Sequence, residues 1–342
     1  MIKVIIPIVI HMFIRIGYIA ILVYHKKFKG DSLNNMKRKI WIDGEFADWN
    51  DASVHILSHS HQRGSLIFGF IPIFENENGT FIFRVDKHIE RLLKSCLMAG
   101  IPIEYKENEL IDAIFDTVKE NPGSKFIKIS VYIASIEIDV VPQDPFTKVA
   151  IAAYDPQKDI IEKNSQPFHS SKQLSVWIEK ERHQRRQDII EPQIKIAANY
   201  TSPMIAKWKA RKNGYDEIIL TDSEDYVTEA PTSNVFIVNQ GGVLRTAHED
   251  EVLHGITRMS IIEIAEDEGI EMNIGRIPLR ELKEAREVFI TSSSHLVYPV
   301  NSLDGKPIGN GEAGKTTMIL KNRFLRVTEG KDNKFNKWLC PV

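Results

Sequence analysis

Gln193-Ile-Lys-Ile-Ala-Ala-Asn-Tyr200 opens the stretch that decides the fold, and Val227-Thr-Glu-Ala-Pro-Thr-Ser-Asn-Val-Phe-Ile-Val238 closes it. The residues between them predict an amphipathic helix followed by a short strand. Lys195 stands among apolar and small residues, where loss of hydration disfavours the ammonium form and makes the amine a nucleophile. Glu229 arrives after the helix and the strand, in a segment that gives a carboxylate no packing role.

This pair of residues suits a particular chemistry. An amine such as that of Lys195 forms a Schiff base with an aldehyde, and an acid such as Glu229 keeps a pyridine nitrogen protonated. Each residue alone also has an ordinary explanation, because a lysine in an apolar stretch often extends its amine to the surface and a glutamate on a strand often faces solvent. The surrounding motifs decide between these explanations.

Five strings of this sequence closely resemble those of the class IV aminotransferases that use pyridoxal 5′-phosphate (PLP), which include the branched-chain and D-amino-acid types. They are Lys195–Tyr200, Gly214–Glu217, Val227–Phe236, Leu253–Arg258 and Arg84–Arg91. The resemblance covers about residues 39–328 in the right order. It implies an α+β fold of two domains with the cofactor between them, and a homodimer that completes each pocket.

The resemblance also implies the domain limits and the cofactor contacts. We expect a small α/β domain over residues 36–160, a larger PLP-binding domain over 161–328 and a C-terminal tail over 329–342, in which nothing indicates a function. Lys195 is the expected catalytic residue. The residues expected to bind the cofactor are Arg91, Lys195, Tyr200, Glu229, Ile256, Thr257 and Ser293. The residue pattern alone leaves Arg91 open as a solvated arginine, and the resemblance assigns it to the phosphate.

The substrate side departs from the family pattern. Branched-chain enzymes typically carry Tyr-Gly-x-x-x-Phe-Glu-Gly, whereas this chain has Arg63-Gly-Ser-Leu-Ile-Phe-Gly-Phe70. They usually have Tyr-Ile-Arg where this chain has Phe126-Ile-Lys128. Arg63 and Lys128 are candidate carboxylate binders, with a structural salt bridge as the alternative for each. The residues expected near the substrate are Arg63, Phe68, Phe126, Lys128 and Ser294.

The function implied is transfer of an amino group from an amino acid, branched-chain-like, to a 2-oxo acid through Lys195. The alternatives are a D-amino-acid or (R)-amine transaminase, and a PLP-dependent lyase of the aminodeoxychorismate type. A catalytically silent PLP-binding or membrane-associated protein is disfavoured by the presence of Lys195, Tyr200 and Glu229 together. Arg63 is more like the D-amino-acid branch, and the Ala-Ala-Asn-Tyr200 continuation is closer to the branched-chain branch.

Composition agrees with an enzyme of small molecules. The 342 residues suffice for two domains, and the 43% hydrophobic and 26% charged content is ordinary for a globular protein. The net charge of −2 implies no nucleic-acid partner. Cys96 and Cys340 are far apart in sequence, which fits a reducing, cytoplasmic location. His55, His59 and His61 have no carboxylate or cysteine spaced with them, so no metal is expected.

The first 35 residues differ in character from the rest of the chain. Val4–Tyr24 is about one membrane span long, but His11 and Arg15 make a spanning helix costly. This segment is an N-terminal membrane anchor, a signal sequence, or no part of the working protein. We favour the third interpretation, with Met36 as the natural start and no membrane contact by residues 4–24.

Periodicity predicts the main elements around the site. An Asp-Gly pair at 43–44 indicates a hairpin. Asp86 is expected to cap a helix that runs to about Ala99, with Ile89, Leu92, Leu93, Cys96 and Leu97 as its apolar stripe. Alternation predicts a strand over Phe126–Ile138. The helix after Lys195 is expected to carry Met204, Ile205 and Trp208 on one side, and Gly255 is expected to open a helix whose free amides cradle a phosphate.

Overall fold

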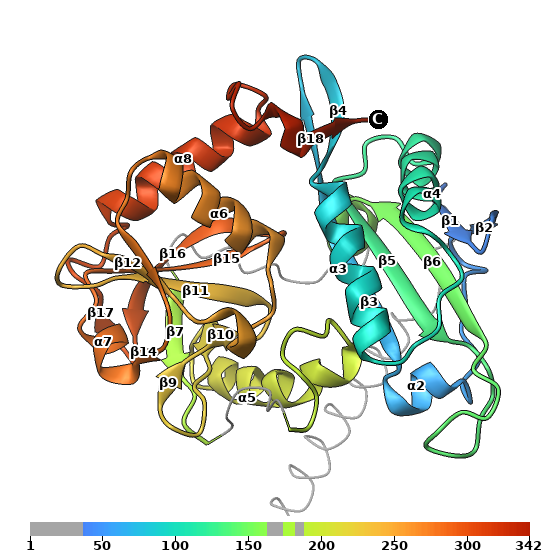
Figure 1. Cartoon of the computed structure of the whole chain (residues 1–342), viewed down its shortest axis with the longest axis horizontal. Helices are drawn as coiled ribbons and strands as arrows, with labels where there is room; N and C mark the ends of the chain where they lie inside the picture. Colours follow the sequence, from blue (N-terminus) through green and yellow to red (C-terminus); the bar gives the residue numbers. More distant parts are fainter. Residues whose placement is uncertain (1–36, 163–173, 182–187) are drawn as a thin grey trace, which may run out of the picture.

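A computed structural model describes residues 37–162, 174–181 and 188–342 of the chain, which form two lobes, each built on its own β-sheet (Figure 1). The architecture is therefore the expected α+β fold of two domains. Residues 1–35, on which the membrane and signal interpretations depend, lie outside the described part. No helix within the described ranges has the length and apolar character needed to cross a bilayer.

The first sheet is antiparallel throughout, with the strand order β18-β4-β3-β5-β6-β1-β2. Its strands are β1 (Lys39–Ile42), β2 (Glu45–Asp48), β3 (Leu66–Asn76), β4 (Gly79–Phe83), β5 (Phe126–Ile133), β6 (Thr147–Tyr154) and β18 (Leu339–Pro341). The Asp43-Gly44 turn joins β1 to β2 with both residues at positive φ, which confirms the predicted hairpin. The strand predicted over Phe126–Ile138 is shorter than expected and ends at Ile133.

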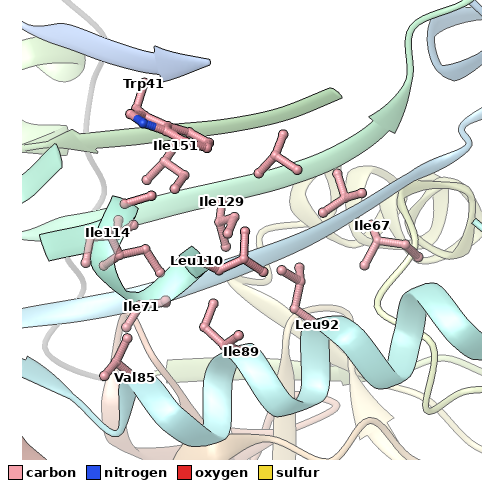
Figure 2. Packing of buried hydrophobic residues seen from close by; sticks show 14 of the residues in the cluster. Trp41, Ile67, Ile71, Val85, Ile89, Leu92, Leu110, Ile114, Ile129 and Ile151 are labelled. Carbon is pink, nitrogen blue, oxygen red and sulfur yellow. The ribbon is translucent and has the colours of Figure 1, made fainter. Parts of the chain in front are cut away.

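Two helices, α3 (Val85–Met98) and α4 (Glu107–Glu120), pack against this sheet. Figure 2 shows Ile89 and Leu92 of α3 turned toward sheet residues such as Ile71 and Ile129. Two details of α3 differ from the prediction. Its N-cap is Arg84, at a left-handed φ of 44°, and Asp86 lies in the first turn. Leu97 does not join the apolar stripe, because it is 83% exposed.

The second sheet forms the other lobe, with the path β13-β12-β11-β15-β16-β7-β8. Its strands on this path are β7 (Leu174–Ile178), β8 (Glu217–Ile219), β11 (Ser233–Val238), β12 (Leu244–Thr246), β13 (Met272–Ile274), β15 (Glu287–Ser292) and β16 (Leu296–Leu303). The short strands β10 (Glu229–Ala230) and β17 (Lys306–Pro307) pair with β11 and β16. β9 (Tyr226–Val227) and β14 (Ile277–Pro278) form a separate ribbon.

Helices α6 (Ile256–Asp267) and α8 (Lys315–Thr328) cover this second sheet. Their buried residues meet the stacked rings of Phe236 and Phe289, whose centroids lie 4.9 Å apart. The short helix α7 (Leu279–Lys283) lies over the β9–β14 ribbon. The glycine-bounded start predicted for α6 is confirmed, because Gly255 is its N-cap residue.

Helix α5 (Thr201–Lys212) follows Lys195. The side that it buries is not the side on which the sequence predicted the large apolar residues. Pro203, Ala206 and Ala210 are its buried residues, whereas Met204, Ile205 and Trp208 are 51%, 41% and 63% exposed. Small residues face the sheet because α5 packs closely on β8. The large apolar side chains are therefore left at the surface of the chain.

The C-terminal residues return to the first lobe. After α8 the chain forms a short 3-10 helix, Asn336–Trp338, and then β18, which pairs with β4 at the edge of the first sheet. Phe335, Trp338 and Leu339 are buried. The expected tail is thus part of the core, and it joins the two lobes a second time. We propose that the boundary between the domains follows the π-helix Pro156–Ile161, near residue 160.

Candidate active site

Lys195 is fixed by the first lobe. Its carbonyl oxygen accepts a hydrogen bond from the Phe68 amide of β3 at 3.1 Å, and its amide donates to the Ser95 hydroxyl of α3 at 3.2 Å. The side-chain amine donates to the Tyr200 hydroxyl at 2.9 Å and lies 4.7 Å from the centre of the Phe68 ring. The direction of the amine is therefore set by β3, α3 and the short helix Ala197–Tyr200 together.

The amine points into a cavity of about 400 Å³. The cavity is lined by residues of both lobes: Phe68, Phe70, Arg91, Lys128, Lys195, Tyr200, Glu229, Pro231, Thr232, Ser233, Asn234, Leu253, Gly255, Ile256, Thr257, Thr291, Ser292, Ser293 and Ser294. This volume lies within the usual range for small-molecule sites, and its lining combines apolar side chains with charged and hydroxyl-bearing ones.

Glu229 belongs to the second lobe and is 3% exposed. Its Oε2 accepts hydrogen bonds from the Leu253 amide at 3.2 Å and from Asn234 Nδ2 at 3.3 Å. Asn234 stands directly across the β10–β11 ladder from Glu229 and also donates to the Leu253 carbonyl at 2.9 Å. The carboxylate is thus held in one orientation at the cavity wall, which gives Glu229 the functional setting that its sequence position suggested.

Four of the lining residues are suited to an anion. Arg91 of α3 lines the cavity and donates to the carbonyl of His254 at 2.9 Å. Burial lowers the pKa of the Arg91 guanidinium to about 10, so it stays a cation at neutral pH. Ile256 and Thr257 begin α6, where backbone amides lack carbonyl partners within the helix. Ser293 follows β15 and lines the same cavity.

Other lining residues combine aromatic rings with a second amine. Lys128 lies opposite Phe70 in the β3–β5 ladder, and its amine is 3.8 Å from the centre of the Phe68 ring. Burial, aided by the charge of Lys195, lowers the pKa of Lys128 to about 8. Ser294 lines the cavity as well. Lys128 thus provides a positive charge, on which an anionic group of a ligand could bind.

Two of the predicted substrate residues do not line the cavity. Arg63 ends the short helix α2 (His59–Arg63), is exposed, and donates to the Ile138 carbonyl at 3.1 Å. Phe126 stacks on Phe70, with ring centres 4.6 Å apart, and so supports the wall from behind. The structure places the other predicted residues around one space, while the substrate roles of Arg63 and Phe126 stay predictions.

Sequence reasoning missed several lining residues. Phe70 departs from the family pattern, yet its alternation with Phe68 on β3 also places it on the cavity face. Asn234 and Leu253 belong to the family motifs but were assigned no role, and they are the partners that orient Glu229. The pairing of Asn234 with Glu229 across a tight turn is the signal that would have identified the first of them.

The three spaced histidines do not converge on a common point. His59 is buried, and its ring nitrogens contact the Ser65 hydroxyl at 2.7 Å and the Val140 carbonyl at 2.9 Å. His55 and His61 are exposed. In the part of the chain that the structure describes, no three His, Cys, Asp or Glu side chains are grouped for a metal ion.

The site and the fold together define a class of protein. The family model described as amino-transferase class IV matches residues 72–303, so the chain belongs to the class IV aminotransferases.

Three similar proteins illustrate the relationship, and each is described as a branched-chain aminotransferase. A branched-chain-amino-acid aminotransferase of Pseudomonas aeruginosa is 30% identical over 300 residues, which is 87% of this chain and 95% of that protein. A branched-chain amino acid aminotransferase from Thermobaculum terrenum, solved in its PLP-form, superposes with a TM-score of 0.79 at 25% identity over 89% of this chain and 98% of the other. A branched-chain aminotransferase from Thermoproteus uzoniensis, solved with norvaline, superposes with a TM-score of 0.80 at 30% identity. The match covers 89% of this chain and 99% of the other.

Proposed function

We propose that this chain is a PLP-dependent aminotransferase that moves the amino group of a branched-chain-like amino acid to a 2-oxo acid. The observation that carries the proposal is that Lys195, anchored on the first lobe, and Glu229 of the second lobe line the same cavity of about 400 Å³. An amine and an acid that line one cavity suit the two ends of one aromatic aldehyde. The family to which the chain belongs supports the same function.

The residues present fit this cofactor. Its phosphate suits Arg91, Ser293 and the first amides of α6, which all line the cavity, because a guanidinium and a helix N-terminus both favour an anion. Its pyridine nitrogen suits the carboxylate of Glu229, which Asn234 and the Leu253 amide hold in place. Gly255 is needed at the turn into α6, because a Cβ there would collide with the Asn234 side-chain oxygen.

When bound, the cofactor supplies a reactive aldehyde carbon and a ring that accepts electrons. The chain itself supplies proton transfer and orientation. We assign to the Lys195 Nζ the removal and return of the substrate α-proton, as general base and then general acid. Tyr200 accepts a hydrogen bond from this amine and would donate its hydroxyl proton to the phenolic oxygen of the cofactor. The carboxylate of Glu229, oriented by its donors, holds a proton on the pyridine nitrogen.

The substrate end supports an amino acid with an apolar side chain. Phe68 and Phe70 give apolar walls, and Lys128 offers a charge for a carboxylate. The same aromatic walls with one cation would also serve a 2-oxo acid acceptor that carries a second carboxylate. A D-amino-acid or (R)-amine transaminase and an aminodeoxychorismate-type lyase remain the alternatives that the substrate tests distinguish.

We also propose that the enzyme is a cytoplasmic homodimer. Both cysteines are free thiols, as expected in a reducing compartment. Exposed apolar side chains gather on segments that lie side by side near α2, since Ser58 forms a bridge with Ile136. They are Val54, Ile56, Leu57, Ile136, Ile138, Val140 and Val141. A patch of this kind on a single chain is typical of a protein interface, and sedimentation would reveal whether two chains associate through it.

Replacing Lys195 with Ala tests the function directly. The variant is expected to lose the visible absorbance of the bound cofactor and all measurable turnover, whereas wild-type protein should transfer an amino group from valine, leucine or isoleucine to 2-oxoglutarate or pyruvate. Unchanged turnover in Lys195→Ala would show that Lys195 is not the catalytic residue and would contradict the proposed function. A wild-type protein that releases pyruvate and ignores 2-oxoglutarate would be a lyase, and D-amino-acid donors alone would indicate the D-specific branch.

A further inference from the structure

Arg84 joins the two lobes behind the cavity. It precedes α3 in the first lobe, is 6% exposed and does not line the cavity. Its Nη1 donates to the Ser260 hydroxyl at 3.1 Å and to Glu263 Oε1 at 2.6 Å, both on α6 of the second lobe. Figure 1 shows α3 and α6 on the facing sides of the two lobes. A single buried guanidinium therefore ties one helix to the other.

The contact continues to the first residue of α6. The Ser260 hydroxyl donates to the Ile256 carbonyl at 2.9 Å, so Arg84 reaches the helix N-terminus through one intervening side chain. A second tie lies two turns along α3, where Arg91 donates to the His254 carbonyl just before Gly255. The two arginines thus hold α6 at two points, one within the cavity and one behind it.

The C-terminal residues hold Arg84 in turn. Its amide donates to the Trp338 carbonyl at 2.7 Å, and its guanidinium lies 4.6 Å from the centre of the Trp338 ring. Arg84 has a left-handed φ of 44°, an unfavourable conformation for a residue with a side chain. A strained backbone conformation persists only where surrounding contacts hold the residue in place, and such residues are common at functional sites. Here the surroundings are α6 on one side and Trp338 on the other.

We infer that Arg84 is a positioning residue that sets the separation of Arg91 from the amides of Ile256 and Thr257, and so the affinity for a phosphate-bearing cofactor. The inference rests on the proposed function, in which these groups hold the PLP phosphate. Arg84 acts by placing the two halves of the anion site and not by contact with the phosphate, because it lies outside the cavity and Glu263 offsets its charge.

Binding of PLP and of pyridoxal, which lacks the phosphate, tests this inference. The measurement is the dissociation constant of each for the full chain stripped of cofactor, and the ratio of the two is the phosphate preference. Arg84→Met is expected to lower the phosphate preference about tenfold, since it removes hydrogen bonds of a charged group, with little change in the affinity for pyridoxal. Arg84→Lys should recover part of the loss.

Glu263→Gln separates positioning from simple charge and covers the case in which Arg84→Met does not fold. This variant adds a net positive charge near the site, so an electrostatic role for Arg84 predicts a higher phosphate preference. Positioning predicts a lower one, by roughly threefold, because the tie to Arg84 is weakened. Arg245→Met is the matched control, since Arg245 is a part-buried arginine paired at 2.7 Å with Glu281, away from the cavity.

The outcomes are distinct. A lower phosphate preference in Arg84→Met and Glu263→Gln, with none in Arg245→Met, supports the inference. An unchanged preference in both, or a higher one in Glu263→Gln, overturns it while the phosphate site itself stands. A wild-type chain that binds PLP no better than pyridoxal overturns the phosphate assignment and, with it, the role of Arg84.

Discussion

The Lys195 amine donates a hydrogen bond to the Tyr200 hydroxyl at 2.9 Å, and the centre of the Phe68 ring lies 4.7 Å from the same amine. Lys195 and Tyr200 are five apart in sequence and are linked by the short helix Ala197–Tyr200, which turns the chain so that both side chains enter one cavity. The geometry of this pair sets the position from which the amine reaches a reacting atom.

Tyr200→Phe is expected to lower kcat about tenfold or more while the protein still binds the cofactor, because a group that positions a base contributes through orientation. The variant lacks the hydroxyl that would donate a hydrogen bond to the phenolic oxygen of the cofactor. Its loss should also raise the pKa of the bound cofactor, since such a hydrogen bond favours the anionic form of that oxygen. Absorbance measured against pH checks this. An unshifted profile would show that the hydroxyl serves only Lys195.

Lys128 should make the enzyme sensitive to mildly alkaline pH. Its pKa is lowered to about 8, so the amine is charged below that pH and neutral above it. The KM for 2-oxoglutarate is therefore expected to rise above about pH 8, and Lys128→Met should have a high KM at every pH. Lys128→Arg should keep the low KM to higher pH. The control is Lys125→Met, an exposed lysine paired with Glu75.

The charged form of Lys128 should also lower the free energy of unfolding of the protein. A lysine whose folded pKa is depressed favours the unfolded state at any pH where both states are protonated, so the cost is fully present below pH 8 and disappears as pH rises toward 10.5. Lys128→Met is expected to stabilise the protein by on the order of 1–3 kcal/mol at pH 7 and by less at pH 10. Denaturant unfolding at both pH values measures this, and an equal effect at both would contradict the lowered pKa.

Phe70 is expected to limit the size of the substrate side chain. Phe70→Gly removes a ring from the cavity wall, so the ratio of kcat/KM for phenylalanine to that for valine should rise about tenfold. The variant should also lose on the order of 2–4 kcal/mol of stability. Phe126→Leu is the control, because Phe126 supports Phe70 without lining the cavity. It should lower stability and leave the ratio near its original value.

Gly255→Ala should displace the Glu229 carboxylate indirectly, through Asn234. The added methyl group would collide with the Asn234 side-chain oxygen, and Asn234 is a donor to Glu229. Turnover is expected to fall by roughly a hundredfold, in line with a displaced electrostatic group. Gly275→Ala meets only Asn273, at 3.4 Å, and should be near neutral. Equal activity of the two variants would show that Asn234 moves without affecting the carboxylate.

The sequence predicted the parts of the site that depend on local chemistry. Lys195, Tyr200 and Glu229 stand out within one stretch of chain, and Gly255 marks the start of α6, because motifs of this kind are short and continuous. The α+β class and the hairpin at Asp43-Gly44 were predicted for the same reason.

Features that depend on tertiary packing were not predicted. Periodicity showed that α5 has an apolar side but not which side faces β8, and Ala206 and Ala210 face it because small residues allow close approach. Leu253 and Arg84 act through partners 24 and 176 residues away, and no local pattern reports such distances. The packing of the residues after 328 was not predicted for the same reason, since β18 finds its partner in β4.

The pairing of β18 with β4 also bears on the order in which the molecule is assembled. During synthesis the other strands of the first sheet precede the second lobe, while β18, the strand at the outer edge of that sheet, follows the second lobe. Maturation of the first lobe must therefore wait for the second, and a protease cut between the lobes would leave two fragments that still hold each other.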